Sequence, residues 1–507
     1  MPGSGAFVRF AFTNFGAFLL DTKDLSVIRG ASALLDDTAV ALPAHLAKAG
    51  LPRFETVFAR ASEALFHTDS LANAAALRDA IETRAAATGQ SARPTFATAV
   101  RAWAPDETLA DALRGLEASL RAEQLRRPTV IPDTATAQGA CALDGVRPAS
   151  ATAYRGGGAI SVSAATRERL QRGRELRVGL LGRVFPEAAG LDGRPFEADF
   201  DALAKFHEPA AGFPYAHGWS RSVPRPVRAK MCVVHGDGNA FGTCRARVTS
   251  IEGLRRFAAV VDDAMREALR TALQPLWDRA EGVGAIPLHI LVWAGDEWSL
   301  VLPAGFGALA MRDLGVGFRD AVARALAQRG LGGADDVRAA VDGALTLTIG
   351  AVFCDAHEPI ERAIALAKML VEDGKARTRG LEHDAVRGNV VDFAVVESGF
   401  VPSSMAGLAS RRMPPGATDV TRGAMTLDDY ATLIREVAAL KAAEFPQARV
   451  HAITRAAEGG AATGTSVADE AAKVTTRVAS AASAAGVNLS DASSWPARRE
   501  LWDYVPF

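Results

Sequence analysis

The stretch "VVHGDGNAFG", residues 233–242, runs an apolar strand straight into Asp237, which Gly238 and Asn239 follow. A strand that ends in a carboxylate and a glycine turn is often a solvated loop, although it can also hold a metal ion. A calcium loop is a third interpretation, but no further ligands follow at EF-hand spacing. The choice depends on whether other carboxylates reach the same place.

A second acidic turn lies in "LVWAGDEWSLVLP", residues 291–303, where two apolar strands flank Asp296 and Glu297. In a split β-α-β sheet, the first strand and the hairpin between the second and third strands lie side by side. We therefore expect Asp296 and Glu297 to converge with Asp237 at one edge of a sheet.

The pattern of elements around these turns supports such a sheet, because apolar strands alternate with helices of 3.6-residue period. The same order of strand, helix, two strands, helix and strand occurs near the start of the chain. An internal repeat of this kind predicts an α+β protein with two ferredoxin-like domains. The expected strands are 5–12, 54–60, 63–68, 93–103, 227–236, 286–294, 298–304, 344–354 and 389–396, and the expected helices are 25–35, 70–87, 250–273, 307–329, 358–376 and 426–445.

The composition is that of an ordinary globular protein. The chain has 507 residues, 49% of them hydrophobic and 23% charged, and a net charge of −1, so no global basic character indicates nucleic-acid binding. Its four cysteines form no CxxC pair, which favours a reducing compartment over a disulfide framework. We find no signal peptide and no apolar run long enough to span a membrane, so we expect a cytoplasmic protein without membrane contact.

The expected cluster of acids favours metal chemistry, because neighbouring carboxylates repel one another unless a cation lies between them. Oxygen ligands suit Mg²⁺ or Mn²⁺, which retain waters and bind substrate phosphates. Two such ions can activate a ribose hydroxyl and stabilise a leaving pyrophosphate. Gly295 is small enough for a phosphate chain to approach the backbone, and Lys375 ends a predicted helix from which it could reach a nucleotide phosphate.

These residues carry a resemblance to a known family. "GDGNAFG", 236–242, and "AGDEW", 294–298, resemble the two metal-binding motifs of palm-type nucleotide cyclases, the GGDEF superfamily. Residues 10–35, "FAFTNFGAFLLDTKDLSVIRGASALL", resemble the opening of the large, polymerase-like subunit of type III CRISPR effector complexes, with its aromatic strand and Gly-Ala-Ser element. Residues 344–376 are similar to the last strand and helix of that family's second palm domain.

The resemblance implies a nucleotidyl cyclase that makes a cyclic oligoadenylate second messenger from ATP, by phosphoryl transfer with two Mg²⁺ or Mn²⁺ ions, in antiviral defence. It also implies guide or target RNA and other CRISPR effector subunits as partners. The residues so implied are Asp237, Asp296 and Glu297 as catalytic metal ligands, and Gly238, Asn239, Gly295 and Lys375 as nucleotide-binding residues.

The resemblance also divides the chain into four parts. The first palm looks inactive, because its strand ends at Asn14 without an aspartate and its hairpin turn "ARAS", 59–62, contains no carboxylate. We expect no HD nuclease domain, since too few residues precede Phe7. The expected parts are a degenerate first palm domain, 1–105, a small zinc-module-like insert with connectors, 106–225, a catalytic second palm domain, 226–385, and a mainly helical C-terminal domain, 386–507.

Two departures from the family pattern bear on function. The hairpin reads Ala294-Gly295-Asp296-Glu297, where the family usually has Gly-Gly-Asp-Asp, and the longer glutamate affects the second metal position. "GACALDGVRPAS", 139–150, resembles a reduced form of the family's zinc module, but it keeps only Cys141 and has Asp144 where a partner cysteine is expected. Structural zinc normally needs four ligands, so we expect none here.

Two other functions stay open at this point. One is a catalytically degenerate scaffold subunit that binds guide RNA and backbone subunits, which the altered hairpin favours and the intact acids oppose. The other is a stand-alone cyclic-dinucleotide synthase, for which a homodimer is conceivable.

Several remaining features have simple interpretations. We expect His235 to be a surface residue at the end of a strand, with contact to a base or a phosphate as the alternative. We expect Arg225, Arg228, Arg255 and Arg256 to be solvated, or to help bind RNA or triphosphate. The glycine-rich "YRGGGAIS", 154–161, lacks the Lys-Ser/Thr of a P-loop and is interpreted as a flexible loop. The dipeptide His383-Asp384 lacks the further ligands of a phosphohydrolase.

Overall fold

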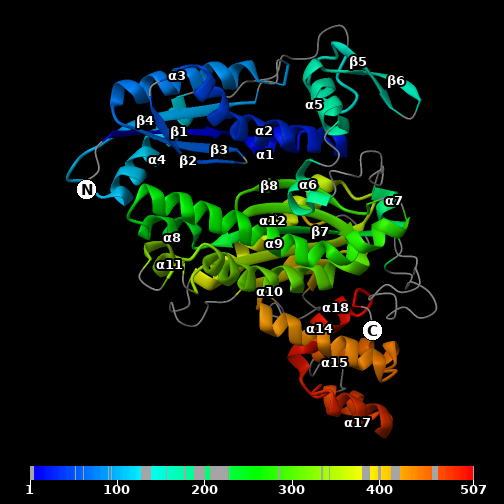
Figure 1. Ribbon diagram of the computed structural model, residues 1–507. Coiled ribbons are helices and arrows are strands. Elements are labelled where there is room, and N and C mark those ends of the chain that lie inside the picture. The colour runs from blue at the N-terminus through cyan, green and yellow to red at the C-terminus, as the bar shows by residue number, and fades with distance from the viewer. Residues whose placement is uncertain are drawn as a thin grey trace.

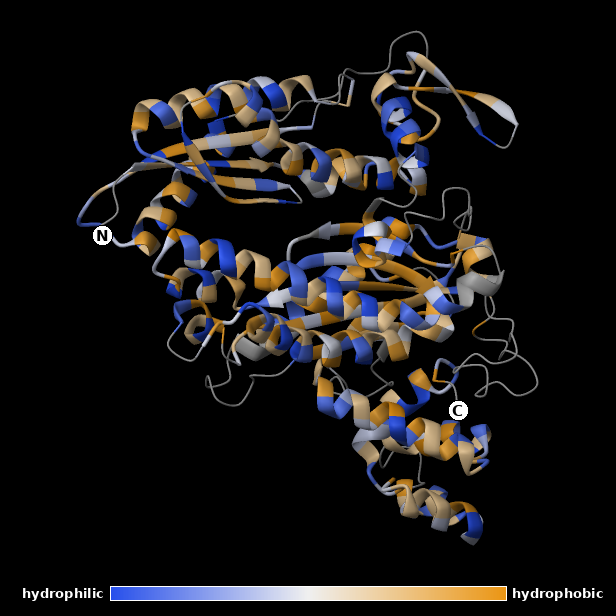
Figure 2. Cartoon of the chain, in the orientation of Figure 1, coloured by the Kyte–Doolittle hydropathy of each residue, from blue (hydrophilic) through white to orange (hydrophobic). Residues whose placement is uncertain are grey.

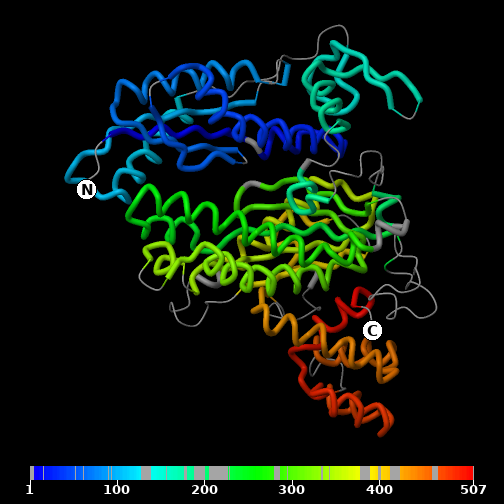
Figure 3. Tube along the Cα trace, in the orientation of Figure 1, coloured from blue at the N-terminus to red at the C-terminus, as the bar shows by residue number. Residues whose placement is uncertain are grey.

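Two domains of sheet and helix lie one above the other, with a group of C-terminal helices below the second, in the computed structural model (Figures 1 and 3). His383-Asp384 and part of the predicted middle region fall outside the described residues. The described residues are 5–505 without 52, 61, 89–90, 93, 127–138, 156, 176–178, 188–199, 206–226, 228, 284–285, 333–334, 342, 380–388, 398–400, 413–422 and 460–465.

The first domain is a four-stranded sheet with helices between its strands. Its elements are β1 (Gly5–Phe12), α1 (Phe15–Leu19), α2 (Leu25–Lys48), β2 (Phe54–Arg60), β3 (Glu63–Thr68), α3 (Leu71–Ala87), β4 (Phe96–Trp103) and α4 (Leu109–Arg126). The strand order is β2-β3-β1-β4, and β1 pairs antiparallel with both β3 and β4. Helices α2 and α3 begin at hydrogen-bonded caps, since Asp24 accepts the Val27 N–H and Ser70 accepts the Asn73 N–H. This is the expected ferredoxin-like arrangement.

A small module follows the first domain along the chain. Its elements are β5 (Ala151–Arg155), β6 (Gly158–Val162), α5 (Ala164–Glu175), α6 (Gly179–Val184) and α7 (Phe200–Lys205). Helix α5 packs against the first domain, whereas α6 and α7 contact the second domain. The expectation of a flexible loop at 154–161 is wrong, because β5 and β6 form an antiparallel hairpin there that projects from the molecule (Figure 1). Helices α2 and α5 cross at Gly30 and Gly173, where a Cβ on Gly30 would lie 1.8 Å from the Arg169 carbonyl oxygen.

The second domain repeats the first and extends it. Its elements are β7 (Lys230–Asn239), α8 (Phe241–Arg247), α9 (Ile251–Val283), β8 (His289–Ala294), β9 (Glu297–Pro303), α10 (Ala304–Gln328), α11 (Asp336–Val341), β10 (Thr346–Asp355), α12 (Ile360–Arg379), β11 (Val390–Val395) and β12 (Met425–Thr426). The sheet order is β12-β11-β10-β7-β9-β8, in which β11 runs parallel to β10. The sheet therefore continues past residue 385, where the sequence analysis places a domain boundary.

The two sheets share a common core of four strands. The order β8-β9-β7-β10 corresponds to β2-β3-β1-β4, strand for strand. The turn after the first strand is also shared: Asn14 (φ 53°) and Ala240 (φ 61°) are both left-handed, and a Phe-Gly pair follows each. The two-palm α+β fold expected from the sequence is confirmed.

Helices dominate the end of the chain, and they pack beneath the second domain (Figure 1). They are α13 (Met405–Arg412), α14 (Leu427–Ala442), α15 (Gln447–Gly459), α16 (Val467–Ala472), α17 (Thr476–Ala484), the 3₁₀ turn Ala492–Ser494 and α18 (Trp495–Leu501). The Tyr430 hydroxyl of α14 donates to the Ala308 carbonyl of α10 at 3.0 Å. The rings of Tyr504 and Phe353 lie 4.6 Å apart, which joins the last residues to β10.

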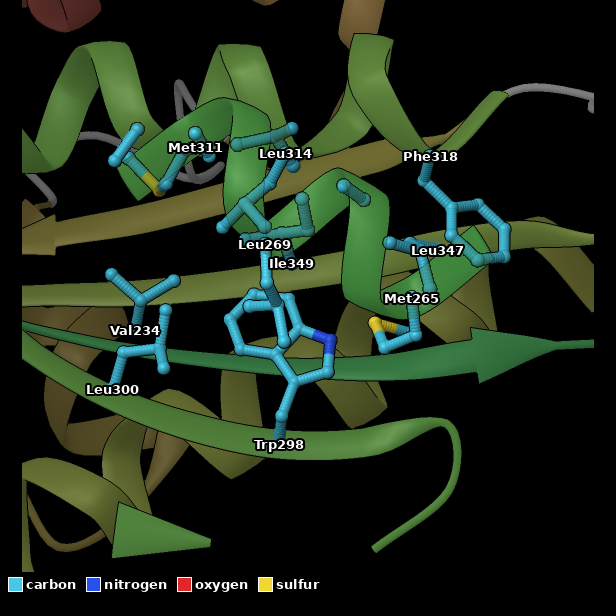
Figure 4. Packing of buried hydrophobic residues seen from close by; sticks show 14 of the residues in the cluster. Val234, Met265, Leu269, Trp298, Leu300, Met311, Leu314, Phe318, Leu347 and Ile349 are labelled. Carbon is cyan, nitrogen blue, oxygen red and sulfur yellow. The ribbon is translucent and has the colours of Figure 1, made fainter. Parts of the chain in front are cut away.

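The second sheet has an apolar face around Trp298, which is fully buried with Met265, Leu269 and Leu347 (Figure 4). Hydrophobic residues run along the strands of this sheet (Figure 2). Gly236 opposes Trp298, and a Cβ there would lie 2.0 Å from the indole ring. The core thus fixes the end of β7 against β9. Among the described residues, no helix combines the length and apolarity needed to cross a membrane.

Candidate nucleotide and metal site

The candidate site lies where β7 and β9 end their pairing. Gly236 pairs with Trp298 in the last register position, so Asp237 and Glu297 come next on the two strands. Side chains alternate between the faces of a strand, and Trp298 occupies the apolar face with α9 and α10. Asp237 and Glu297 therefore point to the opposite face, which α12 covers.

Asp296 joins Asp237 from the tip of the β8–β9 hairpin. A Cβ on Gly238 would lie 2.7 Å from Asp296 Oδ2 and 2.3 Å from the Phe241 ring, so glycine is needed for this carboxylate to lie against β7. Burial, together with the negative charge of Asp237, raises the pKa of Asp296 to about 6. Burial is the larger cause, and the contribution of Asp237 agrees with the expected convergence of the two carboxylates.

Two lysines of α12 face these acids. Lys375 Nζ lies 2.5 Å from Asp237 Oδ2 and 3.1 Å from the Gly238 carbonyl oxygen. Lys368 Nζ lies 2.7 Å from Glu297 Oε1. The lysines are about two helical turns apart, which places them on one face of α12. The expectation that Lys375 is near the site thus has a geometric basis, whereas Lys368 is not among the residues predicted from the sequence.

His235 lies beside this cluster and is buried, so the expectation of a surface residue is wrong. The reason is that β7 is a central strand, covered by β9 and β10 at its sides and by helices on both faces. Its Nδ1 lies 2.9 Å from Ser299 Oγ, and its Nε2 lies 3.9 Å from Glu297 Oε1. Burial and the positive charge of Lys368 lower the pKa of His235 to about 3, so the imidazole is neutral.

Asn239 and Gly295, which the sequence analysis predicts to bind nucleotide, have different structural roles. The Asn239 side chain donates to Thr346 Oγ1 at 3.0 Å and accepts from Thr348 Oγ1 at 2.9 Å, so it fastens β7 to β10. Gly295 has φ +67°, which a turn here requires of glycine, and nothing lies within 4 Å of where its Cβ would be. Open space at Gly295 is what the approach of a phosphate chain needs.

The acids fit a divalent cation in part. Within the described ranges no group of three or more His, Cys, Asp or Glu residues is arranged to hold a metal ion. Burial, and after it the negative charge of Asp237, raises the pKa of Asp296, and a cation bound there would relieve both costs. Glu297 is engaged with Lys368. Asp237 and Asp296 are therefore the candidate ligands for a divalent cation, and the expectation of two Mg²⁺ or Mn²⁺ ions stays a prediction.

The first domain carries the same edge without the aspartate. Ala11 pairs with Glu63, so these two residues occupy the positions of Asp237 and Glu297. The edge is not free of acids as expected from 59–62, because Glu63 begins the next strand. Burial opposes its ionisation, but the nearby Arg9, 2.7 Å away, and Arg245 lower the pKa of Glu63. An arginine thus balances the acid in the first palm.

The first domain also contributes a cation to the second site. Arg60 ends β2 and donates to the Ala258 carbonyl at 2.9 Å, and its charge partly lowers the pKa of Asp296. Arg255 Nε donates to the Thr56 carbonyl, also across the domain boundary. Arg256 pairs with Asp335. Arg255 and Arg256 are therefore held by structural contacts, whereas Arg225 and Arg228 lie outside the described residues. Arg60 is a candidate site residue that the sequence of its own hairpin turn did not indicate.

Comparison with known proteins supports this architecture. No protein-family model and no curated protein matches the sequence. Solved structures with a similar fold are those of Csm1–Csm4 cassettes, so the resemblance drawn from the sequence is confirmed for the fold.

The match in fold covers most of this chain at low identity. A Csm1–Csm4 cassette in complex with pppApApA aligns over 99% of this chain and 69% of its own, with TM-score 0.57 and 12% identity. A cassette with AMPPNP aligns over 93% and 65%, with TM-score 0.51 and 13% identity. Csm1 of T. onnurineus aligns over 85% and 56%, with TM-score 0.48 and 14% identity. The chain spans between 56% and 69% of the length of these three neighbours.

Proposed function

We propose that this chain is a nucleotidyl cyclase that joins ATP-derived nucleotides into a cyclic oligoadenylate. The observation that carries the proposal is that the charges of Asp237 and Asp296 interact at the end of a central palm strand, beside two lysines and an arginine. Acids that repel each other destabilise a fold, so their presence at this edge has a reason if they bind a cation and phosphates. The solved neighbours with AMPPNP and pppApApA bind adenine nucleotides, which favours ATP as the substrate.

Each residue of the site has a role in the proposed reaction. Asp237 and Asp296 would hold a divalent cation, which neutralises phosphate charge and makes a ribose hydroxyl more acidic. Lys375 and Lys368 lie where they can bind phosphate oxygens, and Arg60 adds positive charge from the first palm. Gly295 leaves the hairpin tip open to the triphosphate. Catalysis of this type depends mainly on positioning and charge neutralisation.

The test is incubation of the purified chain with labelled ATP and Mn²⁺, with and without RNA, followed by mass spectrometry of the products. We expect a cyclic oligoadenylate that Asp237→Ala and Asp296→Ala each reduce at least about 100-fold, as loss of a catalytic group does. Asp320→Ala is the matched control, because that exposed aspartate of α10 pairs only locally with Arg319 at 3.5 Å. Wild-type protein that binds no nucleotide and forms no product would refute the proposal.

A scaffold role is the second candidate, and a specific observation favours it. Lysines already neutralise Asp237 and Glu297, so the acids are tolerated without a metal ion. In either role we propose that the chain assembles with RNA and with another effector subunit, as Csm1 does with Csm4 in the neighbouring structures. Co-purification with the products of adjacent genes separates an assembled subunit from a stand-alone synthase.

A further inference from the structure

The module between the two palms has a polar centre that the proposed function does not use. It contains two short segments at the base of the β5–β6 hairpin, a turn before β5 and the first turn of helix α5. The first is Cys141-Ala-Leu-Asp144, and the second is Ser163-Ala-Ala-Thr166, so each places two side chains with hydrogen-bonding atoms three positions apart. In a four-ligand zinc ribbon, each of two turns carries a pair of ligands separated by two residues. The same spacing occurs here, but three of the four residues are not cysteines.

The side chains of Cys141, Ser163 and Thr166 all meet at the carboxylate of Asp144. Its Oδ2 accepts from Thr166 Oγ1 at 2.6 Å and from Ser163 Oγ at 3.3 Å, and its Oδ1 accepts the backbone N–H groups of Val146 and Arg147 at 2.9 and 2.8 Å. The Ser163 hydroxyl also contacts Thr166 Oγ1 at 2.8 Å. The Asp144 side chain is 0% exposed. A buried carboxylate with this many donors is fully satisfied.

The ionisation of Asp144 agrees with this geometry. Burial raises its pKa, but the hydrogen bonds from Thr166, from the backbone of Arg147 and Val146, and from Cys141 outweigh burial and lower the pKa to about 2. The carboxylate is therefore ionised at neutral pH and acts as a fixed negative centre. Structural zinc is held by four ligands, mainly thiolates and imidazoles, and the neutral hydroxyl groups of Ser163 and Thr166 are not among its usual ligands.

The module needs such a centre because its apolar core is small. Buried apolar residues here are Val27, Cys141, Ala153, Val162 and Leu170. Small units of this kind usually depend on a metal ion or a disulfide for stability. Among the described residues, the cysteines are free.

We propose that Asp144 replaces a zinc ion as the organising centre of this module, with Cys141, Ser163 and Thr166 at the positions of the other ligands. The hydrogen-bonded carboxylate joins the two turns as a metal ion would, and the module folds without metal. Because the Thr22 hydroxyl donates to the Leu143 carbonyl at 2.7 Å, the first turn also connects directly to the first palm.

The first experiment measures metal in the purified wild-type chain by plasma mass spectrometry, before and after exhaustive chelation. We expect less than about 0.1 zinc per chain and no change in hydrogen exchange over residues 139–175 after chelation, because structural sites hold about one zinc tightly. Stoichiometric zinc, or loss of protection on chelation, would overturn the proposal.

Two variants test the geometry independently. Asp144→Asn keeps the shape but removes the charge, and we expect at least tenfold faster exchange over 139–175, whereas Asp37→Asn, an exposed residue of α2 paired with Arg172, should leave it unchanged. Unaltered protection in Asp144→Asn would refute the central role of the carboxylate.

The triple variant Asp144→Cys/Ser163→Cys/Thr166→Cys completes a four-thiolate site with Cys141. We expect it to bind about one Co²⁺ with the absorption of tetrahedral thiolate coordination. A folded triple variant, judged by circular dichroism, that gives no such spectrum would show that the four positions do not form a metal-like tetrad. The wild-type metal content and Asp144→Asn decide the question if the triple variant does not fold.

Discussion

Replacement of Lys375 by methionine removes the ammonium group that lies 2.5 Å from Asp237, while keeping a side chain of similar length. The Lys375 side chain is 14% exposed and that of Asp237 is 28% exposed, so the pair lies between a surface and a buried ion pair. Surface pairs contribute about 0–1 kcal/mol and removing one partner of a buried pair costs about 3–5 kcal/mol. We expect a loss of about 2 kcal/mol in the free energy of opening of β7.

The same replacement should strengthen binding of a divalent cation, because Lys375 no longer competes for the Asp237 carboxylate. Free Mn²⁺ at about 100 times its dissociation constant stabilises a protein that binds it by about 2.7 kcal/mol. In the variant, Mn²⁺ should therefore restore the protection that the loss of the lysine removes. Hydrogen exchange of the β7 amides measures the opening free energy locally, which avoids assuming that all domains unfold together.

The control is Lys23→Met, because Lys23 makes an exposed pair with Glu361 at 3.4 Å and is itself 70% exposed. Its effect should stay below about 0.5 kcal/mol, with no response to Mn²⁺. Weaker Mn²⁺ binding by Lys375→Met than by wild type would refute the reasoning, since it would show that Lys375 supports the cation site instead of competing for it.

Three further outcomes follow from the site and the module. Gly238→Ala should weaken Mn²⁺ and ATP binding at least about tenfold in calorimetry, because its Cβ would lie 2.7 Å from Asp296 Oδ2. Gly30→Ala should destabilise the packing of α5 on α2 by about 1–3 kcal/mol and speed exchange in α5, whereas Gly16→Ala, with nothing within 4 Å, should not. Without metal, the pKa of Asp296 is raised from 3.8 to about 6, so the folded state holds a proton that the unfolded state has lost, and stability should fall as pH rises from about 4 to 6. Asp296→Asn should abolish that fall relative to wild type in denaturant titrations at each pH.

The convergence of Asp237 and Asp296 could be predicted from the sequence, because the order of strands and helices along the chain determines which strand ends lie side by side in the sheet. Asp237 ends one apolar run and Asp296 lies between two others, and a split β-α-β sheet brings such ends together. The two-palm fold followed from the same pattern repeated. These predictions needed only periodicity and turn residues, which are local properties of the chain.

The partners of the acids could not be predicted in the same way. In the sequence, Lys368 is one lysine among others in a predicted helix, and only the packing of α12 on the sheet places it beside Glu297. Arg60 belongs to the other palm domain, and its charge acts on Asp296 across the domain boundary. His235 reads as a strand-end residue, because burial of β7 depends on strands and helices distant in sequence. Ser163 and Thr166 gave no signal, since hydroxyl residues in a turn are common. Such contacts are set by tertiary packing, which a single sequence expresses weakly.

The left-handed turn after the first strand of each palm has a consequence for how the two copies have diverged. Asparagine adopts this conformation readily, whereas alanine does so at a cost of about 1 kcal/mol. The palm without the aspartate has Asn14 there, and the palm with the acid pair has Ala240. The second domain thus keeps the costlier left-handed alanine one residue beyond Asn239, next to the candidate site, whereas the first domain has a residue that tolerates this conformation.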